Sequence, residues 1–320
     1  MHDFSFKPDL KLTDFLSQEA FTLSAEVIPP RNGSDQLKVL EQIRTLIGAG
    51  AQFLAVTKGA GGSLRGGSLP IAQAIKERFS KPCIAHFTCR DLTAFDVENQ
   101  LVDHHYFGIR NILALRGDPP DGQPHWQPRE GGHSYAYQLI EQIQKLNAGI
   151  YLKRQNGPNN QETLRTDFCI GAAVYPDHPD EKERIEFFKL KVQAGAQFGI
   201  TDLLFDSEAY ARFLDLCSQN KIQIPILPGT RLLKTRTQAE KMISKFKVKI
   251  PVSILNHLPE AETPENQEEI LHKGLETFMK MANRLRELGA PGVHLYVIND
   301  TESASHALRR LASETKQVKK

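Results

Sequence analysis

Short apolar runs alternate with segments of helical period along most of the chain. Runs rich in β-branched and aromatic residues predict eight strands, at Phe21–Ile28, Gln52–Thr57, Cys83–Thr88, Asn111–Leu115, Asp167–Val174, Ile200–Phe205, Ile222–Leu227 and Val293–Ile298. Apolar residues that recur every three or four positions predict helices over 36–48, 68–79, 93–106, 134–146, 180–194, 207–219, 236–246, 264–288 and 302–313. Because near-continuous apolar strands are typical of a parallel sheet covered by helices, we expect a single-domain α/β protein with a (β/α)₈ TIM barrel. A doubly wound open sheet is the alternative.

A repeated pentapeptide marks one end of the predicted sheet. Ala-Gly-Ala-Gln-Phe stands at 49–53 and again at 194–198, each time just before a strand. We interpret its glycine as a left-handed helix C-cap and the repeat as a recurring loop solution. The opposite ends of the strands are where barrel enzymes carry their active sites. Polar residues follow the strands there: Glu26, Thr57, His86, Arg116, Asp118, Tyr175, His178, Asp202 and Asn299.

The pattern divides the chain into one large unit with two short ends. We expect an N-terminal extension over 1–19, the barrel over 20–314 and a basic tail over 315–320. Two long segments interrupt the repeat. Residues 119–133 follow the fourth strand on the catalytic side and are interpreted as a lid, and residues 147–166 as an oligomer contact or a decoration.

Composition and charge narrow the class of protein. The 320 residues are 40% hydrophobic and 24% charged, which is typical of a globular protein. Because 40 lysines and arginines nearly balance 38 aspartates and glutamates, we expect neither nucleic acid nor a membrane as a partner. The four cysteines lack the spacing of a zinc site, so buried free thiols and no metal are expected. With no signal peptide and no apolar stretch of about 20 residues, a cytoplasmic location is expected.

Two carboxylates stand out at the predicted strand ends. Glu26 lies inside an apolar strand, where burial raises a carboxyl pKa and suits it to act as a general acid. A strand-end carboxylate paired with Arg31 or a lysine is an equally weighted alternative. Asp118 follows Arg116 and Gly117 after the fourth strand and would supply a second carboxylate over the mouth, unless it pairs with Arg116.

Two further groups of residues are weaker candidates for a binding site. The glycines from Gly59 to Gly67 form a loop that could receive phosphate, but they match neither a P-loop nor a dinucleotide-binding fingerprint. The basic residues between 231 and 249 are interpreted as a solvated helix face, with Arg231 and Lys234 the better candidates for holding an anionic group.

Several segments together resemble the 5,10-methylenetetrahydrofolate reductase family. They occur in the family's order from about residue 20 to residue 300: Ser24–Arg31, Val56–Ala60, His86–Cys89, Gly108–Pro119, Tyr135 with Ala136, Ala173–Pro176 with His178, Lys191–Ala196, Phe205 with Asp206, Pro228 with Gly229, and His294–Tyr296 with Asn299. The Glu-Val-Ile-Pro-Pro and Leu-Arg-Gly-Asp segments are the most specific.

The resemblance implies a flavoenzyme of one-carbon and methionine metabolism. NADH or NADPH would reduce FAD, and methylenetetrahydrofolate would then accept hydride and become 5-methyltetrahydrofolate. The positions that match the family's flavin contacts are Thr57, His86, Leu115, Arg116, Gly117, Asp118, Tyr135, Ala136, Tyr175, His178 and Lys191. Glu26, Asp202, Tyr296 and Asn299 match the substrate side. The family's habits also imply a homo-oligomer.

The same resemblance assigns roles to the two carboxylates. Glu26 would be the general acid that protonates N10, and Asp118 would stabilise the positive charge of the resulting iminium. Three substrate-side positions depart from the family: Asp202 replaces a glutamine, Arg236 or a neighbour replaces an aromatic residue, and Asp300 replaces an arginine. They motivate one alternative, a flavin-free methyl-transfer or demethylation enzyme. A flavin-binding subunit of a larger redox complex is a further alternative.

Overall fold

Eight parallel strands close into a barrel, as the hydrophobic pattern predicts. The computed structural model describes residues 6–18, 21–30, 34, 36–59, 66–119, 127–153 and 165–318, with the backbone alone for 316–318. The strands are β1 (Thr22–Val27), β2 (Phe53–Val56), β3 (Cys83–Thr88), β4 (Asn111–Leu115), β5 (Cys169–Val174), β6 (Phe198–Leu203), β7 (Ile226–Thr230) and β8 (Gly292–Tyr296). Each pairs with the next, and β8 pairs with β1, so the TIM-barrel prediction is confirmed.

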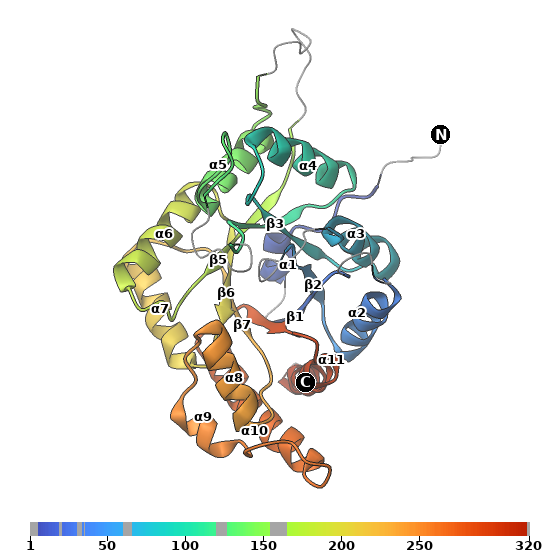
Figure 1. Ribbon diagram of the computed structural model, residues 1–320, viewed down its shortest axis with the longest axis vertical. Helices are drawn as coiled ribbons and strands as arrows, with labels where there is room; N and C mark the ends of the chain where they lie inside the picture. The colour runs from blue at the N-terminus through green and yellow to red at the C-terminus, as the bar shows by residue number, and fades with distance from the viewer. Residues whose placement is uncertain are drawn as a thin grey trace.

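Helices surround this barrel, except that α1 lies across one of its ends (Figure 1). They are α1 (Leu12–Gln18), α2 (Leu37–Ala49), α3 (Ser68–Phe79), α4 (Ala94–Tyr106), α5 (Ala136–Asn147), α6 (Glu181–Gln193), α7 (Ser207–Gln219), α8 (Arg236–Phe246), α9 (Val252–His257), α10 (Gln267–Glu287) and α11 (Thr301–Val318). The C-terminal helix α11 packs beside α2, which follows β1, and beside α10, which precedes β8. These are the two strands whose pairing closes the barrel.

Strand alternation assigns each side chain to one of two cores. On β1, Leu23 and Ala25 pack outward against the helices, whereas Ser24 and Glu26 point into the barrel. The barrel interior is filled by large apolar side chains in its lower and middle layers: Phe53, Ala55, Ile84, Leu113, Cys169, Phe198, Ile200 and Leu227. The layer at the carboxyl ends of the strands carries polar side chains, among them Glu26, Thr57 and His86.

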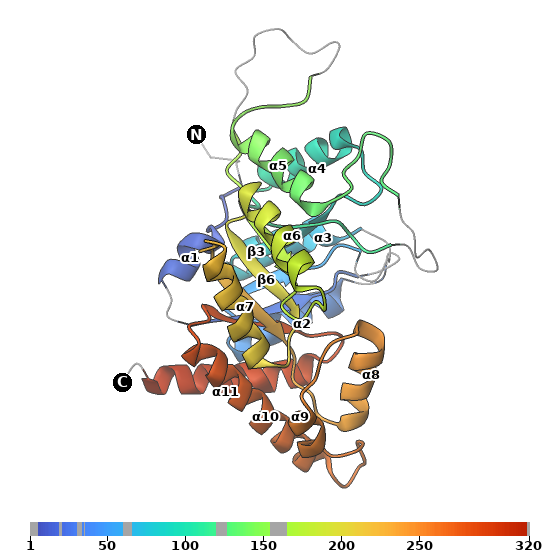
Figure 2. The same cartoon turned by 90° about the vertical axis from the view of Figure 1, so that its left-hand side faces the viewer.

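The N-terminal residues cover the amino-terminal end of the barrel. Figure 2 shows α1 at one end of the barrel and α8 at the other. Leu12 on α1 is fully buried in the interior core, and its N–H donates to Oδ1 of Asn111 on β4 at 2.6 Å. The Asp9 carboxylate accepts from the N–H of Cys83 at 2.8 Å. This packing leaves the opposite end for a ligand.

The sequence-based elements differ from the structure in several places. Strand β7 was expected at Ile222–Leu227 but begins at Ile226, because Ile222 and Ile224 pack against the outer core from a turn that follows α7. Strand β6 begins two residues before the expected Ile200. Helices α1 and α9 were not expected, since each is short and most of its side chains are polar or exposed. Helix α11 also runs past its expected end at 313.

Further expectations concern the cysteines, membrane-spanning helices and the long loops. All four cysteines are free and buried, as predicted. None of the helices in the described ranges is long and apolar enough to cross a membrane. Much of the expected lid (119–133), of the 147–166 segment and of the glycine-rich loop lies outside the described residues, as does Arg31. The division into extension, barrel and tail stays a prediction.

Candidate active site

Glu26 is the last inward-facing residue of β1 and lies among side chains that cannot neutralise a negative charge. Its register partner on β8 is Tyr296, and its Oε2 is 3.5 Å from Nε2 of His86 on β3. Burial raises the pKa of Glu26 to about 8, and burial also lowers the pKa of His86 to about 4. At neutral pH both groups are therefore uncharged, and Glu26 carries a proton that it can donate.

Tyr296 crosses the barrel mouth beside Glu26. Its hydroxyl donates to the carbonyl of Thr201 on β6 at 2.7 Å, spanning β7. The ring passes over Gly229, where a Cβ would lie 2.4 Å from Cε2 of Tyr296. Burial, with Glu26 and Asp202 nearby, raises the pKa of Tyr296 well above its usual range. Tyr296 is consequently a fixed, neutral wall of the site.

Asp202 and Tyr175 extend the site toward β5 and β6. The register between β6 and β7 shifts between Ile200 and Leu203, and this bulge carries Asp202. Burial, reinforced by Asp177, raises the pKa of Asp202 to about 7. The surrounding protein and the carboxylates of Asp202 and Asp118 raise the pKa of Tyr175, although this residue is 46% exposed. Electrostatic interactions therefore link Glu26 to Tyr296, Tyr296 to Tyr175, and Tyr175 to Asp118.

A tight turn after β4 places Asp118. Gly117 adopts a φ of 96°, and a Cβ at this position would lie 2.9 Å from Cβ of Arg90. The guanidinium of Arg90 donates to the carbonyl of Asp118. Because Arg90 is 3% exposed, this contact anchors the turn to the end of β3 and leaves its backbone close to the mouth.

Lys191 brings a positive charge to the same side from α6. Its Nζ donates to the carbonyl of Ala173 at 2.8 Å and lies 5.3 Å from the centre of the Tyr175 ring. Burial, with Arg116 nearby, lowers the pKa of Lys191 to about 8. Two cationic side chains, Lys191 and Arg116, therefore influence each other on this side of the mouth, and such groups would suit a diphosphate.

The free hydrogen-bonding groups at this end fit a flavin ring. Within the described ranges, four buried polar atoms at the strand ends have no hydrogen-bond partner: Thr57 Oγ1, His86 Nε2, Thr88 Oγ1 and Asp202 Oδ1. A ligand that carries both ring N–H and C=O groups would satisfy buried donors and acceptors of this kind. The donor set at the mouth, together with Arg116 and Lys191, therefore suits FAD.

Three of the expected site residues lie further out. Tyr135 precedes α5, is 42% exposed and stacks on Tyr137 with ring centres 5.5 Å apart. His178 lies in the turn after β5, where its Nδ1 contacts the backbone of Asp180. Asn299 is exposed after β8, with a left-handed φ of 63°. These residues form the rim of the site and not its centre, and Ala136 begins α5 beside Tyr135.

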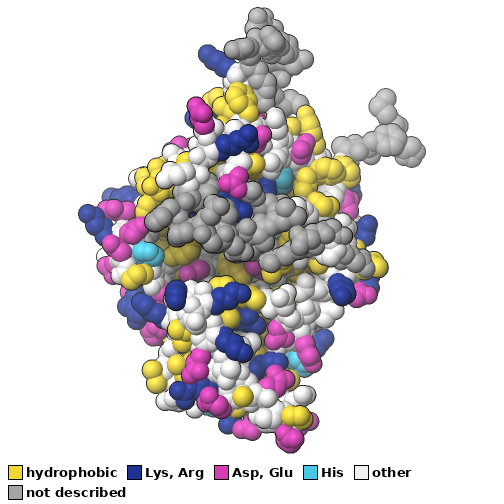
Figure 3. Space-filling model, viewed as in Figure 1, with side chains coloured by type: hydrophobic (Ala, Val, Ile, Leu, Met, Phe, Trp, Pro, Cys, Tyr) yellow, Lys and Arg dark blue, Asp and Glu magenta, His cyan; other side chains and the backbone are white. Residues whose placement is uncertain are grey.

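The basic residues near α8 do not form an unbroken positive patch. Arg236 pairs with Glu240 at 3.0 Å, and Lys234 lies 3.7 Å from Glu262 and 3.9 Å from Asp300. Figure 3 shows acidic side chains mixed with the lysines and arginines on this part of the surface. This agrees with the expectation that most of the cluster is a solvated helix face.

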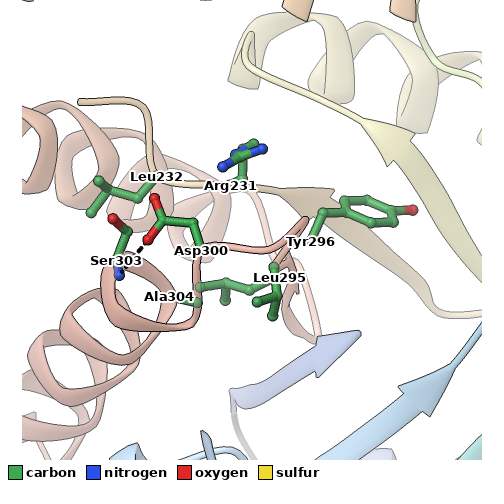
Figure 4. A pocket seen from close by; sticks show the side chains of 8 residues that line it. Arg231, Leu232, Leu295, Tyr296, Asp300, Ser303 and Ala304 are labelled. Carbon is green, nitrogen blue, oxygen red and sulfur yellow. Dashed lines mark hydrogen bonds between the residues drawn. The ribbon is translucent and has the colours of Figure 1, made fainter. Parts of the chain in front are cut away.

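Arg231 and Asp300 lie in a small pocket outside the barrel interior. The carboxylate of Asp300 accepts from the N–H of Ser303 at 3.1 Å and caps α11, as Figure 4 shows. Arg231 is 7% exposed, and burial lowers its pKa although Asp300 raises it. Tyr296 points away from this group in the same view. Arg231 and Asp300 line this small pocket together with Leu295 and Tyr296.

A comparison with protein families tests the resemblance that the sequence segments indicate. The family model described as methylenetetrahydrofolate reductase matches residues 11–312. The chain belongs to the methylenetetrahydrofolate reductase family. The match includes β1 to β8 and every expected site residue.

Curated relatives agree with this assignment at modest identity. The 5,10-methylenetetrahydrofolate reductase of Escherichia coli strain K12 is 29% identical over 289 residues, which cover 89% of this chain and 88% of that protein. Methylenetetrahydrofolate reductase (NADH) 1 of Arabidopsis thaliana is 28% identical over 314 residues, 94% of this chain. The chain spans about half the length of the plant relatives, 50% for the Arabidopsis protein.

A solved structure supports the fold. An uncharacterised protein from Clostridium thermocellum, described as binding two copies of 5-methyl-5,6,7,8-tetrahydrofolic acid, superposes with a TM-score of 0.56. The superposition covers 94% of this chain and 98% of that chain at 16% identity. At this identity the likeness concerns the barrel architecture.

Three residues around the site stand in segments that resemble the family but were given no role there. Ser24, His294 and Gly229 line the mouth or the layer beneath it. Strand alternation could have found the first two, because Ser24 is two residues before Glu26 and His294 is two residues before Tyr296. Gly229 leaves room for Tyr296 and Thr201, which lie on other strands, so only the tertiary structure shows why a glycine is needed there.

Proposed function

We propose that this protein reduces 5,10-methylenetetrahydrofolate to 5-methyltetrahydrofolate with electrons from NADH or NADPH. The observation that carries the proposal is the carboxyl group of Glu26, which is held beside His86 at the mouth of a barrel of this family, where burial raises its pKa to about 8. The relatives named above support the same reaction.

Glu26 supplies the proton that the chemistry requires. The imidazolidine ring of the substrate opens only when N10 leaves, and protonation of N10 makes it a better leaving group. Because Glu26 has a pKa of about 8, its acidic form predominates at neutral pH. The neighbouring His86 is uncharged and does not withdraw that proton.

Asp118 stabilises the charge that ring opening creates. Loss of N10 leaves a cationic N5 iminium, and a carboxylate close to that nitrogen lowers the energy of the charge as it develops. Asp202 would hold the pterin through its unpaired Oδ1, and Asn299 would contact the substrate from the rim.

FAD, when bound, supplies the hydride that it has received from NAD(P)H. The residues that would hold it are Thr57, His86, Leu115, Arg116, Gly117, Asp118, Tyr135, Ala136, Tyr175, His178 and Lys191. Arg116 and Lys191 would bind its diphosphate, and the turn at Gly117 lets the backbone approach closely.

A turnover assay tests the proposal. The purified chain is supplied with FAD and NADH or NADPH, nicotinamide absorbance is followed, and methylated folate is measured by mass spectrometry. We expect oxidation that requires the methylene-bearing folate and yields 5-methyltetrahydrofolate, with unsubstituted tetrahydrofolate as the inactive control. A colourless protein that binds tetrahydrofolate without oxidising nicotinamide would overturn the proposal in favour of methyl transfer. A flavin-loaded chain that NAD(P)H does not reduce would instead indicate a subunit of a redox complex.

A further inference from the structure

Three aromatic side chains meet at the rim of the site, where the start of α5 packs against α6. The ring of Tyr135 stacks on the ring of Tyr137, with ring centres 5.5 Å apart and an interplanar angle of 13°. The centre of the Tyr135 ring also lies 5.7 Å from that of Phe187 on α6, at an angle of 31°. Tyr135 is 42% exposed, and Tyr137 and Phe187 are partly exposed. These three residues are called the rim aromatic cluster.

The N-terminal cap of α5 holds the two tyrosines in place. Oε1 of Gln138 accepts hydrogen bonds from the N–H of Ser134 at 2.8 Å and from the N–H of Tyr135 at 3.1 Å. Tyr135 precedes the helix with an extended backbone, at a φ of −136° and a ψ of 152°. Side chains two residues apart within a helix do not face each other. The extended residue before the helix therefore allows the ring of Tyr135 to lie parallel to that of Tyr137.

The rim aromatic cluster lies one helical turn from a positive charge of the site. Phe187 and Lys191 are four residues apart on α6, so their Cβ atoms lie about 5–6 Å apart on one face of the helix. Lys191 is 9% exposed, and its Nζ is 5.3 Å from the centre of the Tyr175 ring. A diphosphate bound at Lys191 would thus leave the group attached to its outer end within reach of Phe187.

We propose that the rim aromatic cluster binds the adenine ring of FAD by stacking, and so makes the site selective for FAD over FMN. This inference rests on the proposed function, which places the flavin at the mouth and its diphosphate at Arg116 and Lys191. Tyr137 and Phe187 are the new contacts, since only Tyr135 of the three matches a flavin contact of the family.

The chemistry of the two flavins explains the selectivity. In FAD the flavin and the adenosine are attached to opposite ends of the diphosphate, so a flavin in the mouth directs the adenosine outward. Adenine is a flat aromatic ring, and such rings stack on aromatic side chains and remove the exposed faces of both from water. FMN carries the same flavin but ends at a single phosphate, so it has no group to place on the cluster.

The test measures how tightly each flavin binds the apoprotein. Tyr137→Leu and Phe187→Leu each remove one ring and retain apolar bulk, whereas Tyr137→Phe retains the ring. Tyr106→Leu is the matched control, because Tyr106 is 71% exposed at the last residue of α4, at the opposite end of the barrel. Isothermal titration calorimetry gives the Kd values for FAD and FMN, and thermal unfolding shows that each apoprotein is folded.

We expect the Kd for FAD to rise about tenfold in both leucine variants, because each loses one stacking surface for the base. The Kd for FMN should stay unchanged, so the preference for FAD over FMN falls by the same factor. Tyr137→Phe and Tyr106→Leu should bind both flavins as the wild type does.

Three results would overturn the proposal: equal affinity of the wild type for both flavins, an equal loss of affinity for both in the leucine variants, or unchanged FAD binding in these variants. A change confined to the NADH concentration that half-saturates flavin reduction would also overturn it, because the cluster would then bind the adenine of the nicotinamide cofactor. A wild type that prefers FAD through the cluster but reduces no methylenetetrahydrofolate would leave this inference standing and remove the proposed function.

Discussion

Tyr296 reaches across the barrel mouth from β8 and donates its hydroxyl proton to the carbonyl of Thr201 on β6, 2.7 Å away. The strand between them, β7, contributes Gly229 at the crossing point, and a Cβ there would meet Thr201 O at 2.5 Å. The absence of a side chain at Gly229 thus determines where the ring of Tyr296 lies, and this ring forms one wall of the site. The wall in turn borders the carboxyl of Glu26.

Gly229→Ala is expected to displace Tyr296. The added methyl cannot coexist with the present ring position, so the free energy of unfolding should fall by about 1–3 kcal/mol and KM for the folate should rise. Denaturant unfolding and steady-state kinetics measure the two effects. Gly48→Ala in α2 is the control, because nothing lies within 4 Å of a Cβ there. A Gly229→Ala protein as stable as the wild type would contradict the role of this clearance.

Glu26→Gln is expected to separate the two half-reactions. Flavin reduction by NAD(P)H needs no proton from Glu26, whereas opening of the folate ring does. The folate half-reaction should slow by about 10²–10⁴-fold while flavin reduction stays near the wild-type rate. Stopped-flow absorbance of the flavin measures both. Equal loss in both half-reactions would mean that Glu26 has a structural role.

Lys191→Met is expected to weaken flavin binding at neutral pH. Because burial lowers the pKa of Lys191 to about 8, its charge is present below that pH and is lost above it. The wild-type affinity for FAD should therefore fall between pH 7 and pH 9, and the variant should show lower affinity and a flatter profile. Equilibrium titration of the apoprotein measures this. Lys189→Met, exposed on the same helix, should behave as the wild type.

Asp202→Asn is expected to change how stability depends on pH. Burial raises the pKa of Asp202 from 3.8 to about 7, so the folded state favours the protonated form. Its stabilising contribution is complete at low pH and is lost as pH rises through 7. Relative to the wild type, the variant should gain about 2 kcal/mol in free energy of unfolding between pH 5.5 and pH 8.5. A constant difference between these pH values would show that Asp202 ionises normally.

Leu12→Ala is expected to show that the N-terminal helix belongs to the core. Leu12 is fully buried against the barrel interior, so the truncation should lower the free energy of unfolding by about 2–5 kcal/mol. Leu10→Ala is the control, because Leu10 is 43% exposed. Its effect should be within about 0.5 kcal/mol. Equal effects would mean that the end of the barrel is not sealed by α1.

The local hydrophobic pattern predicted most helices and strands correctly, but it failed where tertiary packing determines the local structure. Strands such as β3 and β4 were placed correctly because their apolar runs are bounded by turn residues. The start of β7 was misplaced because Ile222 and Ile224 are buried without belonging to a strand. Helix α1 was missed because a seven-residue segment has little intrinsic helicity, and its stability comes from docking Leu12 into the barrel.

The sequence by itself determined the barrel, its catalytic end, the family and the acidic residue on the first strand, because all of these depend on periodicity or on motifs along the chain. The tertiary structure alone decided that burial raises the pKa of Glu26, that His86 lies beside it, and that Tyr296 passes over Gly229. These properties arise from side chains on β1, β3, β7 and β8, which are far apart in the sequence. A pKa depends on the solvent and charges around a group in space, and strand closure brings those surroundings together.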